Sequence, residues 1–263
     1  MRRLVLTLLL SVGGLLVLAS AGLYAQTDEP EPREYIGADE CGSCHRPQGR
    51  PFDLTAHARA LLTTEDAEEG EPGPLLADFS IQEEVRTFLF PGEDAPRALQ
   101  AADITYIMGT GRLAQRFAYR QGEAVYVLPV QWNVPAGTWE PFLRGAATDA
   151  TWFEAPEHDW LTQCVGCHVT GLDVGTGEWV DSGVQCEACH GPGSEHATLA
   201  DELGRRASAE EVQTVKDAIH SGVDPQMCAQ CHAAGTSTDG VHAFPVGYHP
   251  GQDLSDFYTL HDL

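Results

Sequence analysis

One short pattern, Cys-x-x-Cys-His, occurs four times in this chain of 263 residues and contains all eight of its cysteines. Two intervening residues place the thiols one helical turn apart, which matches the separation of the two vinyl groups of a porphyrin. The adjacent histidine then lies beneath the iron. The pattern therefore predicts four covalently attached haem c groups. The cysteines predicted to bind them are Cys41, Cys44, Cys164, Cys167, Cys186, Cys189, Cys228 and Cys231, and the proximal iron ligands are His45, His168, His190 and His232.

Zinc sites and disulfides are the two alternative interpretations of these cysteines. Cysteine pairs with this spacing bind structural zinc, and exported proteins often contain disulfides. Neither requires a histidine directly after the second cysteine, whereas all four copies have one. The haem interpretation is therefore favoured over both.

Seven histidines lie outside the motifs and are candidates for the distal ligand of each iron. His196 follows the turn Gly191-Pro192-Gly193, which would carry it away from its own haem and toward a neighbouring one. His57 lies in an alanine-rich stretch where small side chains would let a porphyrin approach. The candidates for the remaining positions are His158 and either His242 or His249, with Met108 and Met227 as thioether alternatives. His220 and His261 are expected at the surface.

The N-terminus predicts export. Residues 1–25 have a basic start at Arg2 and Arg3, an apolar run, and small residues before possible cleavage points after Ala21 and Ala25, which is the layout of a signal peptide. If retained, the same run is long enough to anchor the chain in a membrane. Residues 26–34 are predicted to be a flexible leader. Residues 35–263 would then be a tetrahaem domain in the periplasm or at the cell surface.

The net charge of −24 limits the possible partners. Such a chain repels nucleic acid and anionic lipid, so neither is expected to bind, and membrane contact is expected only if the N-terminal segment is retained. Redox partner proteins are expected as electron donor and acceptor. A homo-oligomer or filament is a further possibility, in which a histidine of the C-terminal segment would bind the iron of a neighbouring copy.

The secondary-structure signals change along the chain. A segment at about 77–156 has no cysteine and includes EAVYVLPVQW (123–132) and GTWEPFL (137–143), whose β-branched and aromatic residues predict two or three short strands. Residues 199–219 have helical spacing and predict one or two exposed helices. The stretch FDLTAHARALLT (52–63) also predicts a helix, with His57 on it.

Several longer segments resemble the cytochrome c-554 family of exported multihaem cytochromes. These segments are ECGSCH with AHARAL, YIMG with QRF, VYVLPVQWNVPAGTWEPF, CVGCHVTGLD, VQCEACHGPGSEH and FPVGYHPGQDL. The resemblance implies a mainly α, loop-rich fold wrapped around stacked haems, with a small β-containing insertion. It also implies electron transfer with mostly bis-histidine ligation, and it supports His57 and His196 as distal ligands.

Electron transfer is therefore the expected function, without catalytic residues. The alternative is a redox enzyme that acts on a small nitrogen or sulfur species at one open haem, where Arg112, Arg116 and His158 are candidates to position substrate or transfer a proton. A filament subunit is the third possibility. The number of irons that are open to an external ligand discriminates between the first two.

Overall fold

The computed structural model describes residues 33–65, 74–143, 150–204 and 206–261. The predicted signal peptide at 1–25 and most of the predicted leader at 26–34 lie outside these residues. No helix within the described ranges is both long and apolar enough to cross a membrane.

The expectation of a mainly α fold is wrong. Of the described residues 31% are helical and 21% lie in strands, and the largest element among them is a five-stranded antiparallel sheet. The residues that predicted a minor insertion instead form a sheet with a core on each face. Such a sheet is a principal layer of the fold, because each face buries a separate set of side chains.

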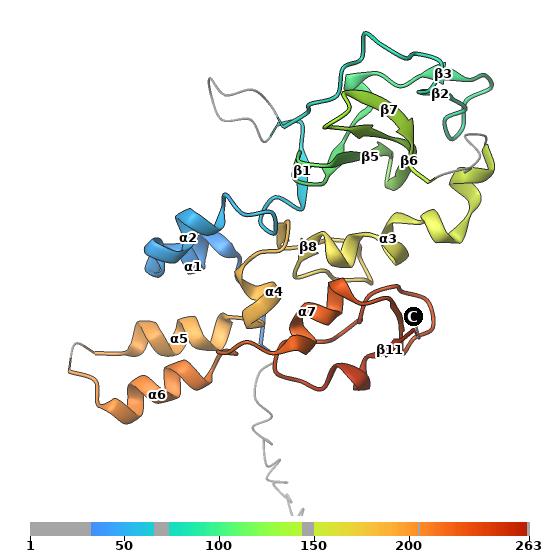
Figure 1. The fold of residues 1–263 in the computed structure, drawn as a ribbon. Helices are drawn as coiled ribbons and strands as arrows, with labels where there is room; N and C mark the ends of the chain where they lie inside the picture. Colours follow the sequence, from blue (N-terminus) through green and yellow to red (C-terminus); the bar gives the residue numbers. More distant parts are fainter. Residues whose placement is uncertain (1–32, 66–73, 144–149, 205, 262–263) are drawn as a thin grey trace, which may run out of the picture. The chain divides into compact units, whose positions relative to one another are not determined.

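The sheet has the strand order β1-β4-β5-β6-β7, and each strand pairs antiparallel with its neighbour (Figure 1). Its strands are β1 (Leu61–Thr63), β4 (Tyr106–Met108), β5 (Ala114–Gln121), β6 (Ala124–Asn133) and β7 (Thr138–Pro141). Strands β6 and β7 confirm the two strands predicted at 123–132 and 137–143. Strand β1 was not predicted, and it brings the chain just after His57 into this sheet.

A bulge accommodates Pro129 in the middle of β6. The pairing of β5 with β6 shifts between Arg116 and Ala118, so that Phe117 faces the segment between Val127 and Gln131. Proline lacks the N–H that a regular ladder needs, so it is tolerated at an interruption of this kind. The Pro129 carbonyl still accepts a hydrogen bond from the Phe142 N–H, at 2.8 Å.

Alternating side chains of the strands build two cores on opposite faces of the sheet. Ile107 and its partner Phe117 enter one cluster with Trp132 and Trp139. The neighbouring pair, Tyr106 and Ala118, enters the other cluster, which also contains Trp160, Val165 and Phe244. Cys164 and Cys167 of one haem motif pack against this second cluster. One face of the sheet therefore packs against the cysteine-bearing part of the chain.

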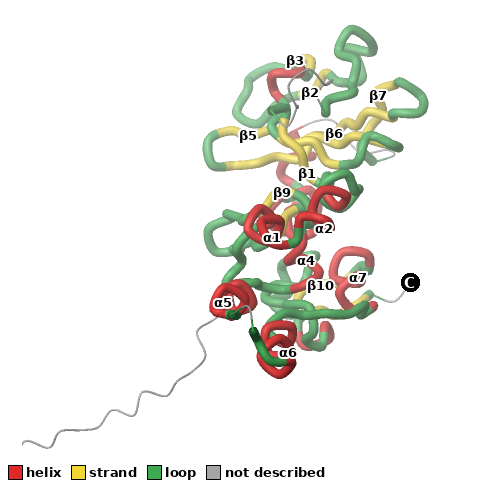
Figure 2. Tube along the Cα trace, turned by 90° about the vertical axis from the view of Figure 1, so that its left-hand side faces the viewer, coloured by secondary structure: helices red, strands yellow, loops and turns green. Residues whose placement is uncertain are grey.

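The remaining strands form three short antiparallel pairs, and the helices are short (Figure 2). The pairs are β2 (Thr87–Phe88) with β3 (Arg97–Ala98), β8 (Val169–Thr170) with β9 (Asp181–Ser182), and β10 (Gly235–Ser237) with β11 (Tyr258–Leu260). The α-helices are α1 (Ala38–Cys44), α2 (Arg46–Phe52), α3 (Trp160–Gln163), α4 (Cys186–His190), α5 (Ser194–Glu202), α6 (Ala209–Asp217) and α7 (Pro225–His232). The 3-10 helices are η1 (Ala101–Asp103), η2 (Ala150–Glu154), η3 (Pro156–His158), η4 (Val165–Cys167) and η5 (Leu254–Asp256).

Helices α5 and α6 confirm the helical prediction for 199–219, although α5 begins earlier. The helix predicted over 52–63 is wrong. Helix α2 ends at Phe52, residues 53–60 form turns, and Leu61 pairs with Met108 in the sheet. The Thr55 hydroxyl accepts a hydrogen bond from the Ala58 N–H at 3.2 Å, a local bond of the kind that competes with helix formation. His57 therefore lies in a turn.

Candidate haem-binding site

Each of the four motifs, here numbered one to four in chain order, lies on or next to a short helix. The first motif ends α1, the second runs from α3 into η4, the third forms α4, and the fourth is at the end of α7. These turns place the two cysteines of each motif on one side, as thioether attachment requires. None of the eight cysteines forms a disulfide with another.

The cysteines bring the motifs together in a definite order. The Cys41 thiol donates a hydrogen bond to Cys186, which lowers the pKa of the Cys186 thiol to about 7 and raises that of Cys41. The first and third motifs are therefore neighbours.

Two further contacts extend this series. Cys231 of the fourth motif hydrogen-bonds Cys167 of the second, which raises the pKa of Cys231 and lowers that of Cys167. The side-chain amide of Gln230, in the fourth motif, also donates a hydrogen bond to the carbonyl of Ala188, in the third motif, at 2.9 Å. It links the third motif to the fourth. The motifs thus lie in the spatial order one, three, four, two.

Two pairs of histidine rings have the separation that one shared metal would require. An imidazole nitrogen binds a metal at about 2 Å, so two imidazoles on opposite sides of an iron have ring centres about 6 Å apart. The His45 and His196 ring centres are 6.2 Å apart, and those of His57 and His232 are 6.0 Å apart. Each pair joins a motif histidine to a histidine that the sequence nominated as a distal ligand.

Backbone carbonyls orient three of the candidate ligands. The Nδ1 atoms of His168, His190 and His196 lie 2.8 Å from the carbonyl oxygens of Ala60, His220 and Val215, respectively. A hydrogen bond from Nδ1–H fixes the tautomer whose Nε2 is free to bind a metal. Burial lowers the pKa of His168, which favours the neutral ring that metal binding needs.

The structure does not bring His158 or His242 to a motif histidine. His158 stacks on Trp152, with ring centres 3.5 Å apart, and its Nδ1 lies 3.0 Å from the Trp152 carbonyl. The His242 Nδ1 lies 2.6 Å from the Asp239 carboxylate. Their roles as ligands stay predictions.

The other histidines differ in their surroundings. His249 Nδ1 contacts the Tyr35 hydroxyl at 3.1 Å, and burial lowers the pKa of His249, so its Nε2 stays available for an iron. His220 was expected at the surface, but it is half-buried, and its Nε2 has no hydrogen-bond partner among the described residues. His261 is exposed, as predicted, and contacts the Thr236 hydroxyl at 2.9 Å.

Cavities lie next to the motifs. One of 820 Å³ borders Cys164, Cys167 and His168 of the second motif. Another, of 360 Å³, is lined by residues of the first and third motifs together with His196. Thiols, imidazoles with free Nε2 atoms and adjoining space therefore occur together, and this donor set fits haem c.

Glu187, which lies between the two cysteines of the third motif, is a structural residue that the sequence did not reveal. Its side chain is 1% exposed, and its carboxylate accepts hydrogen bonds from the N–H groups of Ile36, Gly37 and Gly193 at 2.8–3.1 Å. It thereby joins the chain before α1 to the turn before α5. These segments lead to His45 and His196, and no local pattern marks a contact across about 150 positions.

Gly166, inside the second motif, packs directly against Phe244. A Cβ at this position would overlap the Phe244 ring, which is itself only 4% exposed. We expect Gly166→Ala to destabilise the protein by about 1–3 kcal/mol, the usual cost of overpacking. The measurement is the thermal unfolding midpoint. Gly42→Ala in the first motif is the control, because a Cβ there meets no atom within 4 Å, and an equal loss in both variants would contradict the prediction.

Comparisons with known proteins give one family match and one structural match. Residues 141–191, which contain the second and third motifs, match the family described as "Cytochrome c554 and c-prime". A search of curated proteins found no match. Among solved structures, the crystal structure of the outer cell wall cytochrome OcwA matches with a TM-score of 0.61 and 23% sequence identity, over 86% of this chain and 45% of that one.

The structural match concerns the fold, and this chain spans less than half the length of that cytochrome. The family match falls on the segment that carries two complete haem motifs, and it confirms the resemblance found in the sequence. Covalently bound haem c and electron transfer are what this family match supports. Residues 141–191 therefore resemble the cytochrome c-554 family of multihaem c-type cytochromes, and the fold of the chain is similar to that of a c-type cytochrome.

Proposed function

We propose that the chain is an exported tetrahaem electron carrier in which at least two irons are ligated by histidine on both sides. The observation that carries this proposal is the 6.2 Å and 6.0 Å separation of the two imidazole pairs. The apolar N-terminal segment and the fold match to a cytochrome described as an outer cell wall protein support export.

In this proposal His196 is the distal ligand of the first iron and His57 that of the fourth. A histidine on each side would leave an iron without an open position, so these haems would exchange electrons and would not bind substrate. The pairing also connects segments of the chain, because each distal histidine comes from a different segment than its motif.

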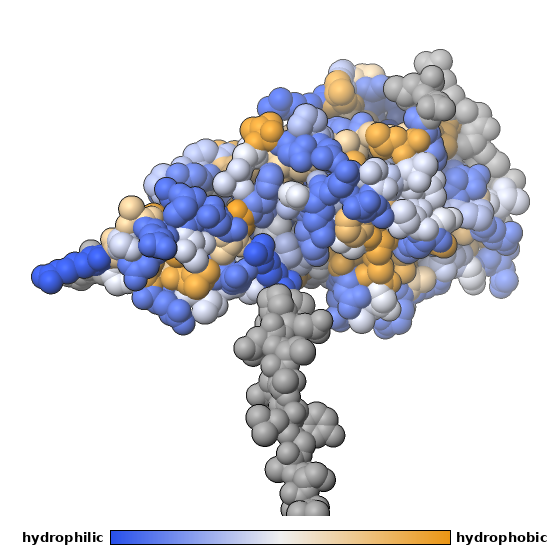
Figure 3. All heavy atoms as spheres, turned by 90° about the horizontal axis from the view of Figure 1, so that it is seen from below, coloured by the Kyte–Doolittle hydropathy of each residue, from blue (hydrophilic) through white to orange (hydrophobic). Residues whose placement is uncertain are grey.

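The order one, three, four, two gives electrons a route through the protein. Each neighbouring pair of motifs is joined by a cysteine–cysteine hydrogen bond or by the Gln230–Ala188 hydrogen bond, so the attached haems would be close neighbours. The first and second haems would then be the two ends. The surface seen in Figure 3 is largely hydrophilic with apolar patches, and the net charge of −24 favours a basic redox partner protein.

Haem content tests the proposal. The intact mass of the purified exported protein should equal the mature chain plus four haems, and a pyridine haemochrome assay should give four haems per chain. A lower ratio in fully matured protein would overturn the tetrahaem assignment. Binding of zinc by the same cysteines would overturn it as well.

One observation favours a second candidate function, a redox reaction at the second haem. The 820 Å³ cavity beside that motif is lined by Met108, Arg112 and Arg116, and among its described lining residues the motif's own His168 is the sole histidine. This iron would then be open or weakly bound by the Met108 thioether. The two arginines would place positive charge near a small anion bound there.

Carbon monoxide separates the two candidates. Titration of the dithionite-reduced protein should bind close to one equivalent of carbon monoxide per four haems if the second iron is open or labile. No binding would leave electron transfer as the sole function. A Met108→Ala variant identifies the haem concerned, because loss of the thioether should increase binding at the second haem if Met108 is its distal ligand.

A further inference from the structure

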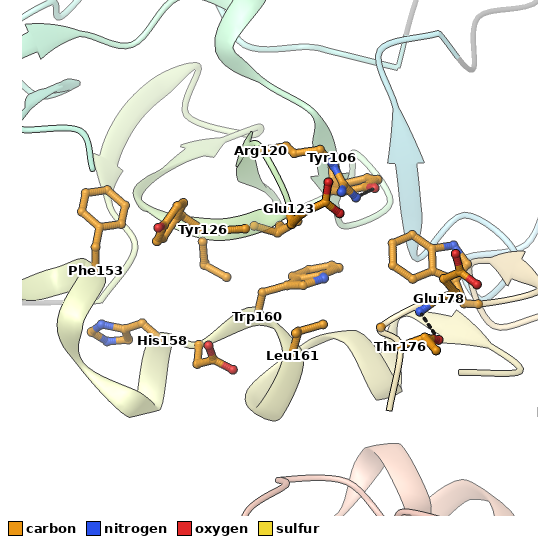
Figure 4. Close-up of a pocket in the computed structure, with 16 residues that line it drawn as sticks. Tyr106, Arg120, Glu123, Tyr126, Phe153, His158, Trp160, Leu161, Thr176 and Glu178 are labelled. Atoms are coloured by element: carbon orange, nitrogen blue, oxygen red, sulfur yellow. Dashed lines mark hydrogen bonds between the residues drawn. The ribbon is translucent and has the colours of Figure 1, made fainter. Parts of the chain in front are cut away.

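A cavity of 720 Å³ lies between the sheet and helix α3, and no motif cysteine or motif histidine lines it (Figure 4). We call it the aromatic cleft, after five of its lining residues: Tyr106, Tyr126, Phe153, Trp160 and Trp179. In Figure 4, Phe153 and His158 lie at one end and Thr176 and Glu178 at the other, with Trp160 between them. Its volume is within the range of small-molecule sites, about 300–1,000 Å³.

The aromatic residues are fixed by one another and by the core. Tyr106 and Trp160 are buried, and their rings are nearly parallel, at 2°, with centres 5.7 Å apart. Trp179 packs edge-on to Tyr106, and Tyr126 packs edge-on to Phe153. Two buried rings thus form the floor of the cleft, and three half-buried rings form its walls. A rigid aromatic wall binds planar ligands at little entropic cost.

The charges around the cleft favour a positive ligand. The exposed residues Glu123, Asp159 and Glu178 supply three carboxylates, whereas Arg120 supplies the one guanidinium of the lining. Arg120 donates a hydrogen bond to the Tyr106 hydroxyl at 2.6 Å, and its guanidinium carbon lies 5.6 Å from the Tyr106 ring centre. One cation, Arg120, therefore already lies over an aromatic ring of this cleft. Aromatic ring faces and nearby carboxylates both attract a positive charge at such a position.

We propose that the aromatic cleft binds a planar aromatic organic cation, such as an N-alkylated pyridinium. The rings would stack with the ligand, the three carboxylates would compensate its charge, and Arg120 would compete with it. The volume exceeds that needed for a single basic side chain, which favours a small molecule over a partner protein. Trp160 begins the helix that leads to Cys164, so the ligand would lie near the second motif. Binding itself does not depend on the proposed electron transfer.

Calorimetric titration of the oxidised protein with oxidised methyl viologen tests the proposal. A sulfonated viologen with the same bipyridinium ring but no net charge is the matched probe, and it should bind more weakly. Trp179→Leu should lower the affinity for methyl viologen about three- to tenfold, the range of a partly desolvated cation–π contact. Glu178→Gln should also lower it, and Arg120→Gln should raise it because a competing cation is removed.

Glu202→Gln on α5 removes an equal charge outside the cleft and should leave the affinity unchanged. Equal binding of the two viologens, or equal losses in Glu178→Gln and Glu202→Gln, would overturn the proposal in favour of general charge attraction. Arg120 is exposed, so Arg120→Gln is expected to fold even if Trp179→Leu does not. An unchanged or lower affinity in Arg120→Gln would also overturn the proposal.

Discussion

Replacing His57 by alanine should convert one haem from low spin to high spin and open its iron to carbon monoxide. The His57 ring centre lies 6.0 Å from that of His232, so the fourth haem would lose its distal imidazole. We expect the carbon monoxide capacity to rise by one equivalent per chain above that of the wild type. The potential of this haem should also rise, because an imidazole ligand stabilises the ferric state. Electron paramagnetic resonance and a carbon monoxide titration measure the change.

The control for this prediction is His261→Ala. His261 is exposed and contacts Thr236, so its removal should leave the spin states unchanged. If His57→Ala retained the wild-type spin states and carbon monoxide capacity in a folded protein, His57 would not be the distal ligand. The backbone hydrogen bonds of residue 57 to Ala60 and Val184 are kept in this variant, so a general collapse of the turn is not expected.

The Glu187→Ala variant should show the largest loss of stability. It leaves three N–H donors without an acceptor, those of Ile36, Gly37 and Gly193. A buried unsatisfied donor costs about 1–3 kcal/mol, so the total should be about 3 kcal/mol or more. For a domain of this size that corresponds to a melting temperature lower by about 6–12 °C. The low-spin signal of the first haem should weaken too, because Glu187 joins the segments that lead to His45 and His196.

Differential scanning calorimetry of Glu187→Ala, Glu187→Gln and Glu202→Ala gives a graded comparison. The glutamine variant keeps one acceptor oxygen and should lose less stability than the alanine variant. Glu202 is exposed at the end of α5, so its replacement should change stability by less than about 0.5 kcal/mol. If the Glu187→Ala protein had the same melting temperature as the Glu202→Ala control, these hydrogen bonds would not hold the two segments together.

The chemistry of this protein could be predicted from its sequence because that chemistry is encoded locally. Attachment of haem c depends on five consecutive residues, and export depends on a short basic and apolar segment. His196 and His57 could be nominated from their neighbours, the Gly-Pro-Gly turn and the flanking alanines. Strands β6 and β7 were predictable for the same reason, because β-branched and aromatic residues over a short run favour extended structure.

The size of the sheet, and its place as a principal layer of the fold, could not be predicted from local sequence. Strand β1 is only three residues long, and it is a strand because Leu61 pairs with Met108, 47 positions later in the chain. The local sequence of that region favoured a helix. Pairing and burial in the second core outweighed this preference, as tertiary context commonly does.

Taken alone, the sequence nominated the residues that can hold haem and an N-terminal segment with the layout of an export signal. Only the tertiary structure decided which motif lies beside which, which candidate distal histidine lies near which motif histidine, and that Glu187 joins the segments around the first motif. It also revealed the aromatic cleft, whose rings come from the sheet, η2, α3 and the segment before β9. These features depend on contacts between residues tens to more than 150 positions apart. Such contacts follow from packing of the whole chain rather than from any local pattern.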